Sequence, residues 1–356
     1  MPNWPNLSFA EAILDATRTC MDRDSGVFLM GLGVDDPKAI FGTTSGLAER
    51  FGAERVFDVP VSENALTGAA LGAATMGMRP ILTHQRLDFA LLSLDQIINN
   101  AAKWHFMFGG QLKAPITIRM LIGRGWGQGP QHSQSYQSLF AHIPGLKVVM
   151  PATPQDAKGL LISSIEDDNP VIFLEHRWLH NLRGTVSQEY FCEPLGKAKI
   201  VHEGNDLTIV ASSYMVFEAY RAAEALAKSN INVEVLDLRT LRPFDGEAII
   251  KSVQKTGHLV VADTGHTTCG FSAEILAYTC ERAFTSLKTA PQRIASPDYP
   301  VPTSHFLAKD YYPRASTIAA KVCEMLGKNS DAIEFLKNIE AKLPSDVPDL
   351  SFSGPF

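Results

Sequence analysis

The stretch "FDVPVSENALTGAALGAATMGMRPI" (57–81) decides the fold of this chain. The apolar run at 55–61 predicts a strand, the small residues at 64–78 predict a helix, and "RPILTH" (79–84) predicts a second strand. From Val59 to Ile81 the acidic residue is Glu63 alone, where the first strand passes into the helix. It is either an ordinary helix-start acid after the N-cap Ser62, or a desolvated carboxylate with a raised pKa that can exchange a proton with a heterocyclic nitrogen.

The same strand and helix alternation continues along the chain. Strands are predicted at 26–33, 115–123, 145–151 and 170–176, and helices at 9–22, 93–108 and 154–166. This order is typical of a doubly wound parallel α/β sheet. A polar, poorly periodic stretch follows at 177–206, and a second α/β series then starts. We therefore expect one domain over 1–185, a linker over 186–206, a second domain over 207–327, and a tail over 328–356 with one short helix.

Composition excludes several classes of protein. The 356 residues carry a net charge of −6 with both signs dispersed, which argues against nucleic-acid binding. We expect no membrane span, because no apolar run approaches the required length, and no secretory signal, because the N-terminus lacks a basic region. Five scattered cysteines favour a reducing, cytoplasmic compartment and argue against a structural zinc site.

Several ordered blocks carry a family resemblance. They are "FDVPVSENALTGAALGAATMGMRPI", "SLDQIINNAAKWHFMFGG", "GPQHSQS", "HIPGLKVVMPATPQDAKGLLISSIEDDNPVIFLEH", "VEVLDLRTLRPFD" and "SPDYPVP". Over about residues 9–327 the chain resembles the β subunits of thiamine-diphosphate-dependent 2-oxoacid dehydrogenases. The resemblance implies a pyrimidine-binding domain followed by a transketolase-type C-terminal domain.

The resemblance also implies roles for four residues. Glu63 would contact N1′ of the cofactor's aminopyrimidine and help activate the cofactor. Phe89 would stack on the pyrimidine ring, or be an ordinary core aromatic. Gln85 matches a glutamine of branched-chain-type members and would line the cofactor site. His132, in the "HSQ" block, would steady the substrate oxyanion or assist acyl transfer, or be a hydrogen-bonded loop residue.

Two further groups of residues are open. Arg86 stands where family members usually have an apolar residue, and either binds an extra carboxylate or phosphate of the substrate or lies at a subunit surface. Four positions match those that surround a monovalent, potassium-type cation in some family members, mostly through main-chain oxygens: Ile116, Ser164, Asp167 and Asn169.

The chain has no G-D-G motif, which family enzymes use to hold Mg²⁺ and the diphosphate. The resemblance therefore implies an α subunit that carries this motif and an α₂β₂ assembly. Two departures from the family pattern bear on function. Leu32 replaces an acid thought to line a tunnel between active sites, although Asp95, another acid of that region, is kept. His266 in "VVADTGHTTCG" replaces a tryptophan in a region that helps dock an acyltransferase core.

These features give three functional hypotheses. The first is the β subunit of a 2-oxoacid dehydrogenase that decarboxylates a 2-oxo acid oxidatively and transfers the acyl unit to a lipoyl acyltransferase. The second is a stand-alone α₂β₂ enzyme that uses the same cofactor for carboligation or for ketol or acyl transfer. The third is a non-catalytic scaffold, against which the retention of Glu63, Phe89 and His132 counts.

Overall fold

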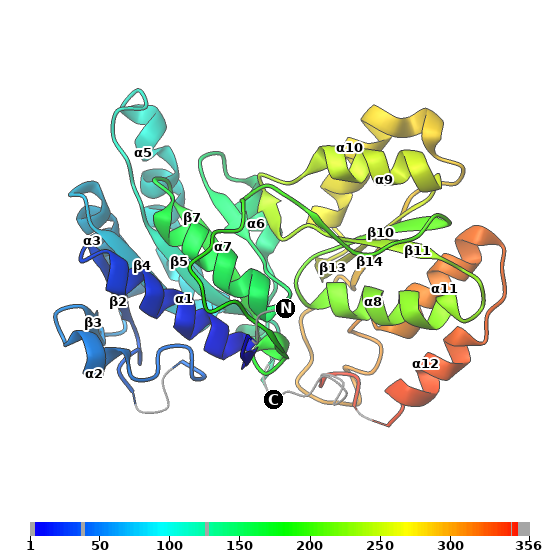
Figure 1. Cartoon of the computed structure of the whole chain (residues 1–356), viewed down its shortest axis with the longest axis horizontal. Coiled ribbons are helices and arrows are strands. Elements are labelled where there is room, and N and C mark those ends of the chain that lie inside the picture. Colours follow the sequence, from blue (N-terminus) through cyan, green and yellow to red (C-terminus); the bar gives the residue numbers. More distant parts are fainter. Residues whose placement is uncertain (1–3, 37–39, 125–127, 343, 348–356) are drawn as a thin grey trace. The chain divides into compact units, whose positions relative to one another are not determined.

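The computed structural model describes residues 4–36, 40–124, 128–342 and 344–347. The chain divides into two compact units (Figure 1). Of the described residues, the first contains those up to Gly123 together with Leu139–Leu195, and the second contains those of Arg124–Ser138 and those from Gly196 to Val347.

The first unit is built on a parallel sheet, as the sequence predicts. Its strands lie in the order β6-β7-β5-β4-β2-β3, and every neighbouring pair is parallel. The bounds are β2 Val27–Gly31, β3 Val56–Phe57, β4 Arg79–His84, β5 Thr117–Ile122, β6 Lys147–Val149 and β7 Val171–His176. A short antiparallel pair, β1 (Asn6–Ser8) with β8 (Arg183–Thr185), accompanies the sheet. The strands of a parallel sheet end together at one edge, where ligands bind in such folds.

Helices pack on this sheet. The helices α1 (Phe9–Arg23) and α7 (Pro154–Glu166) lie against one another, and Figure 1 shows them side by side. The small-residue helix α3 (Glu63–Thr75) packs on β4 and on the helical run that follows α4. The shorter helices of this part of the chain are α2 (Leu47–Phe51), α4 (Leu87–Ala90) and α6 (Gln137–His142).

Two predicted elements differ in the structure. The strand expected over 55–61 ends at Phe57, because the Asp58 carboxylate accepts the N–H of Val59 at 2.8 Å and Pro60 has no N–H to donate. The long helix expected over 93–108 is instead a 3₁₀ turn (Leu91–Ser93), a π-helical segment (Asp95–Ala101) and α5 (Ala102–Met107). Amide side chains compete for its backbone: Asn100 Nδ2 donates to the carbonyl of Asp95 at 3.3 Å.

The second unit is a smaller sheet with helices on both faces. Its strands lie in the order β14-β13-β10-β11-β9, with β9 antiparallel to β11 and the others parallel. The bounds are β9 Lys199–His202, β10 Leu207–Ala211, β11 Val233–Asp237, β13 Leu259–His266 and β14 Gln292–Ser296. A further short strand, β12 (Thr240–Arg242), is not part of this five-stranded sheet. The helices α8 (Tyr214–Ala227) and α11 (Ala315–Leu326) cover one face, and α9 (Gly246–Thr256) and α10 (Phe271–Ala283) cover the other (Figure 1). The predicted α/β fold class is confirmed.

The polar stretch after the first unit contributes to this second sheet. Residues 199–202, inside the range expected to be a linker, form the edge strand β9. The side chains of β9 do not alternate between buried and exposed: the first two are exposed and the last two are half-buried. An edge strand pairs with a neighbouring strand along one side only. The short helix expected in the tail is α12 (Ala332–Glu340), which packs on α8 and α11. Residues 348–356 lie outside the described ranges.

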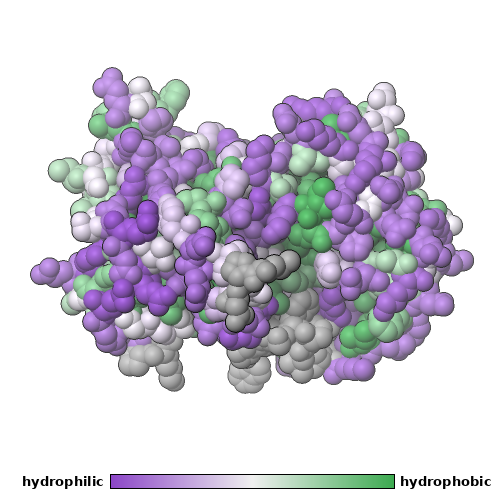
Figure 2. Space-filling model, in the orientation of Figure 1, coloured by the Kyte–Doolittle hydropathy of each residue, from purple (hydrophilic) through white to green (hydrophobic). Residues whose placement is uncertain are grey.

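Hydrophilic residues dominate the molecular face drawn in Figure 2, with small hydrophobic patches between them. Across the described ranges, no helix has the length and apolar character needed to cross a bilayer.

Candidate functional site

A pocket at the carboxyl edge of the first sheet brings together three of the predicted site residues. Glu63, Gln85 and Phe89 all line it. The remaining lining residues come from the ends of β2 and β4, from the segment before α3 and from α3 itself: Gly31, Leu32, Val59, Pro60, Val61, Leu66, Leu82, Thr83 and His84. We call it the Glu63 pocket.

The turn into α3 positions the carboxylate of Glu63. Ser62 occupies the N-cap position, but its side chain makes no capping hydrogen bond, and Glu63 lies in the first helical turn. The side chain is half-buried, and no hydrogen bond or ion pair of its carboxylate occurs within the described residues. The backbone carbonyl of Glu63 accepts from Thr67 Oγ1 at 2.8 Å, which fixes the turn. The carboxylate is therefore available to a ligand that enters the pocket.

Three hydrogen bonds made by two side chains, Gln85 and Asp58, hold the pocket lining in place. Gln85 Nε2 donates to the carbonyl of Leu32 at 3.1 Å, which joins the end of β4 to the turn after β2. Asp58 Oδ1 accepts the N–H of Gly33 at 2.6 Å as well as that of Val59. Gly33 has φ +74°, a conformation that favours glycine. Sequence reasoning missed Asp58, although an aspartate directly after a strand is a common backbone acceptor.

His84 is a second lining residue that the sequence did not single out. Burial lowers the pKa of its imidazole to about 4, and its Nε2 is buried without a hydrogen-bond partner. The ring is therefore neutral at physiological pH. His84 therefore adds no charge to the lining that it shares with Glu63.

The enclosed space of the Glu63 pocket is about 20 Å³. That volume is about enough for one water molecule. A six-membered heterocycle does not fit inside it, so the chain provides one side of a binding site. The residues present nevertheless fit an aminopyrimidine: one available carboxylate, one aromatic ring and an apolar surface of Leu32, Val61 and Leu66.

Arg86 lies away from the pocket lining. Its side chain is buried, and Nη1 donates to the carbonyl of Gly123 at 2.7 Å. Burial, with a smaller contribution from the nearby Arg177, lowers the pKa of the guanidinium to about 10, so it stays charged at neutral pH. In this position Arg86 supports the loop after β5.

His132 belongs to the second compact unit. It ends a short 3₁₀ turn, Pro130–His132, where its N–H donates to the carbonyl of Gly129 at 3.2 Å, and its side chain is half-buried. The Glu63 pocket and His132 are therefore carried by different units.

The four residues expected to surround a cation lie where α7 ends and β7 begins, with Ile116 just before β5. Three of their carbonyls accept hydrogen bonds within the chain: Ile116 from the N–H of Val171 at 3.0 Å, Ser164 from Thr117 Oγ1 at 3.0 Å, and Asp167 from Arg79 Nη1 at 3.0 Å. Asn169 donates its N–H to Asp167 Oδ1 at 2.9 Å.

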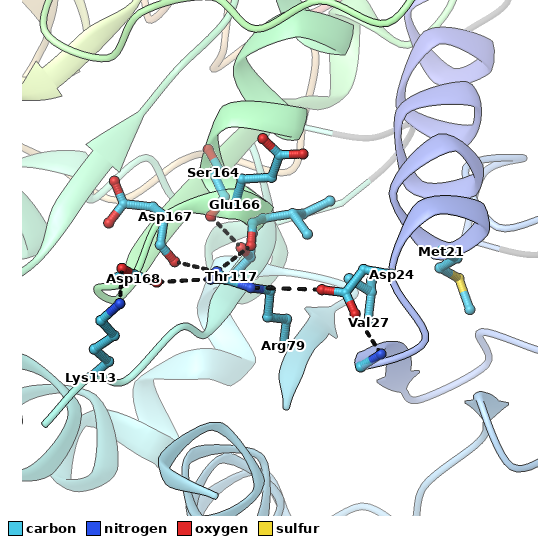
Figure 3. Close-up of polar contacts among 12 residues, drawn as sticks. Met21, Asp24, Val27, Arg79, Lys113, Thr117, Ser164, Glu166, Asp167 and Asp168 are labelled. Atoms are coloured by element: carbon cyan, nitrogen blue, oxygen red, sulfur yellow. Dashed lines mark hydrogen bonds and ion pairs between the residues drawn. The ribbon is translucent and has the colours of Figure 1, made fainter. Parts of the chain in front are cut away.

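The Arg79 guanidinium supplies positive charge to this group of carbonyls, as Figure 3 shows. Nη1 also donates to the carbonyl of Ile165 at 3.2 Å, and Nη2 donates to Asp168 Oδ1 at 2.8 Å. Lys113 Nζ lies 2.5 Å from Asp168 Oδ2, and these hydrogen bonds and charges hold the pKa of Asp168 below its usual value. Carbonyls at a helix C-terminus attract a cation, and here the Arg79 guanidinium provides the positive charge. Within the described ranges no three His, Cys, Asp or Glu side chains form a metal site.

A buried ion pair fixes the strands next to the pocket. Arg119 on β5 contacts Glu175 on β7 through Nε–Oε1 at 2.6 Å and Nη2–Oε2 at 3.1 Å. Burial alone would raise the pKa of Glu175, but the Arg119 charge and the contact with His180 lower it to about 2. Both side chains are fully buried.

Comparison with known proteins agrees with this architecture. Residues 6–181 match the family model "Transketolase, pyrimidine binding domain", and residues 196–318 match "Transketolase, C-terminal domain". The chain belongs to the transketolase-like family that includes the β subunits of pyruvate dehydrogenase E1 components. The resemblance stated from the sequence is thereby confirmed.

Three curated relatives of this E1 β family illustrate the match. The chain is 44% identical over 324 residues to the β subunit of acetoin:2,6-dichlorophenolindophenol oxidoreductase from Cupriavidus necator, covering 88% of this chain and 96% of the relative. The Bacillus subtilis protein of the same name is 40% identical, over 90% of this chain and 98% of the relative. The pyruvate dehydrogenase E1 component subunit β of Rickettsia bellii is 42% identical, over 89% and 98%.

A solved split-gene transketolase, described as an inactive tetramer, resembles the fold of this E1 β-type chain. The TM-score is 0.74 at 22% identity, covering 91% of this chain and 99% of that one. This likeness concerns the fold alone.

Proposed function

We propose that this chain is the β subunit of a heteromeric, thiamine-diphosphate-dependent 2-oxoacid dehydrogenase. The observation that carries the proposal is the Glu63 pocket, in which an available carboxylate and an aromatic ring line the same side of a site too small to be complete. The family relationship to β subunits supports it, because a β subunit functions with a second chain.

Within this proposal each residue has a defined task. When bound, thiamine diphosphate supplies a nucleophilic carbon and accepts electrons as the bond next to the substrate carbonyl breaks. Glu63 holds a proton at the pyrimidine nitrogen that it contacts, Phe89 stacks on the ring, and Gln85 keeps the Leu32 turn in place. His132 donates a hydrogen bond to the substrate oxygen on which negative charge develops.

The cofactor's other half is assigned to the partner. An α subunit with a G-D-G motif would hold Mg²⁺ and the diphosphate in an α₂β₂ assembly, and a lipoyl acyltransferase would accept the acyl unit. Residues 1–185 would form the pyrimidine-binding domain, 186–206 the linker, 207–327 the transketolase-type C-terminal domain and 328–356 the tail. The family models at 6–181 and 196–318 support the two domains, and the second model begins inside the proposed linker. A cytoplasmic location agrees with five free cysteines.

The proposal includes a monovalent cation at the carbonyls of Ile116, Ser164, Asp167 and Asn169. A carbonyl oxygen has two lone pairs, so the hydrogen bonds already accepted leave one for an ion. Because Arg79 already supplies a charge there, we expect K⁺ to add little stability. The melting temperature in potassium chloride against choline chloride of equal ionic strength measures this contribution.

The two acetoin-named relatives, together with Leu32 in the Glu63 pocket, favour a second candidate. In it, a stand-alone α₂β₂ enzyme performs carboligation or ketol or acyl transfer without a lipoyl partner. The reconstituted enzyme should be assayed with 2-oxo acids and with acetoin, using 2,6-dichlorophenolindophenol as the electron acceptor. Turnover of acetoin without turnover of any 2-oxo acid would favour the second candidate.

Calorimetry tests the main proposal. The isolated chain titrated with thiamine diphosphate and Mg²⁺ should show no binding at micromolar concentrations, and addition of the α subunit should restore it. Micromolar or tighter binding by the isolated chain would overturn the assignment of half a site to this chain.

A further inference from the structure

The second unit contains a much larger cavity of about 980 Å³. It lies beside β14, the start of α11, the segment 305–314, and the end of α12 with the residues that follow it. Part of its lining comes from the tail, at Lys337, Glu340, Ala341, Pro344 and Ser345. These five residues lie beyond position 318, where the match to the C-terminal domain model ends. We call this cavity the tail pocket.

Several hydrogen bonds and ion pairs hold the tail against the second unit. Glu340 Oε1 accepts the N–H of Ser316 at 2.9 Å, at the N-terminus of α11. Arg314 Nη1 donates to the carbonyls of Ser345 and Val347, each at 3.1 Å. Asp346 lies 2.8 Å from Arg124 Nη2. The tail side of the cavity is therefore formed in advance and does not have to fold around a ligand.

The lining of the tail pocket is basic in an acidic chain. Five lysine and arginine side chains line it against two carboxylates, whereas the whole chain has a net charge of −6. Arg293, Lys309 and Lys337 take part in no ion pair within the described residues. Arg293 interacts electrostatically with Asp298, but the lining still has an excess of positive charge, which attracts an anion with several charges.

The same cavity has an aromatic and apolar side. Tyr311 and Tyr312 contact each other edge to face with ring centroids 4.9 Å apart, and Phe306 is 83% exposed. Ile294 and Pro313 add apolar surface to the lining. Tyr311 is buried and supports this side from behind, so Phe306 is the flat, exposed ring on which a heterocyclic base can stack.

We propose that the tail pocket binds a nucleoside phosphate. Its volume lies in the range of small-molecule sites, about 300–1,000 Å³. Lysine and arginine are the usual partners of phosphate oxygens, and the aromatic side accommodates the base. The phosphates contact Arg293, Lys309 and Lys337, and the base stacks on Phe306. This site is separate from the Glu63 pocket and does not depend on the proposed function.

Calorimetry of the full chain with ATP, and with pyrophosphate as a probe of charge alone, tests the proposal. We expect ATP to bind about tenfold more tightly than pyrophosphate, since stacking of the base on an aromatic ring adds to the affinity. Lys337→Glu and Arg293→Glu should each weaken ATP binding at least tenfold. Both side chains are exposed, so the melting temperature should stay unchanged.

Lys251→Glu is the matched control, because Lys251 is an exposed lysine on α9 that does not line the cavity. If Lys251→Glu weakens ATP binding as much as the pocket variants do, the effect comes from the net charge of the chain, and the proposed site is overturned. Pyrophosphate that binds as tightly as ATP would overturn the nucleoside assignment, and no binding of either probe at 1 mM would overturn the proposal.

Discussion

The Glu63 pocket and the tail pocket lie in different units of one chain and differ in how completely the chain builds them. The first encloses about 20 Å³ and has one available carboxylate, while the second encloses about 980 Å³ with a basic lining. Residues 31–89 line the first, inside the range of the pyrimidine-binding model, whereas the second uses residues beyond both family-model matches.

The difference separates two ways of building a site. A site that shares its ligand with another subunit needs only one rigid side, and hydrogen bonds from Asp58 and Gln85 provide that rigidity here. A site contained in one chain needs walls from several of its segments, and Glu340 and Arg314 provide one of them by holding the tail. Chemistry is therefore expected at the first pocket, and reversible binding at the second.

The largest expected effect comes from Glu63→Gln. The amide cannot exchange a proton as the carboxylate does, so turnover of the reconstituted enzyme should fall on the order of 10²-fold or more. Steady-state kinetics with a 2-oxo acid measure the loss. Glu49→Gln is the control, because Glu49 is an exposed acid in the first turn of α2 and should leave turnover unchanged. Near-normal turnover of Glu63→Gln would contradict the assignment of chemistry to the Glu63 pocket, and with it the contrast to the tail pocket.

A smaller effect is expected from pH at the Glu63 pocket. The folded pKa of His84 is about 4 and its unfolded value is about 6.5, so the unfolded chain binds the proton more tightly. Above pH 6.5 His84 is neutral in both states and costs no stability. As pH falls from 6.5 towards 4, the free energy of unfolding decreases, by about 2 kcal/mol at pH 5.

His84→Phe should abolish this part of the acid sensitivity, as measured by urea unfolding at pH 7.5 and pH 5. His142→Phe, at an exposed position of α6, should leave the acid sensitivity in place. An equal loss of stability at pH 5 in the wild type and in His84→Phe would contradict the prediction.

The smallest effect is expected at the tail pocket. Glu340→Gln removes a charge from the N-terminus of α11 and weakens the acceptor of the Ser316 N–H, which should cost about 0.5–1 kcal/mol. The urea midpoint of unfolding measures it. Glu334→Gln, on an exposed position of α12, is the control. A cost no greater than that of the control would show that the tail is not held by this contact.

Much of the fold followed from local pattern. Alternating strands and helices predicted both α/β units, and Glu63 was predicted where a strand passes into a helix, which is where α3 begins. Gln85 and Phe89 follow the neighbouring strand β4 in the chain, which explains why they line the same pocket. The family resemblance, now confirmed, came from the order and spacing of whole blocks.

What sequence could not provide depends on residues far apart in the chain. The Arg79 guanidinium meets the carbonyls of Ile165 and Asp167 across more than 80 positions, so its place beside the expected cation residues was not visible from the motif. Burial decides the pKa of His84, and burial depends on the packing of the complete sheet.

The sequence by itself determined the family, the fold class and the position of Glu63 at the head of α3, because these depend on periodicity and on ordered motifs. Tertiary structure alone decided the small volume of the Glu63 pocket and the existence of the tail pocket. A cavity is bounded by segments from distant parts of the chain, here from 267 to 345. Its volume and charge exist only after those segments have packed, which is why no local pattern predicted it.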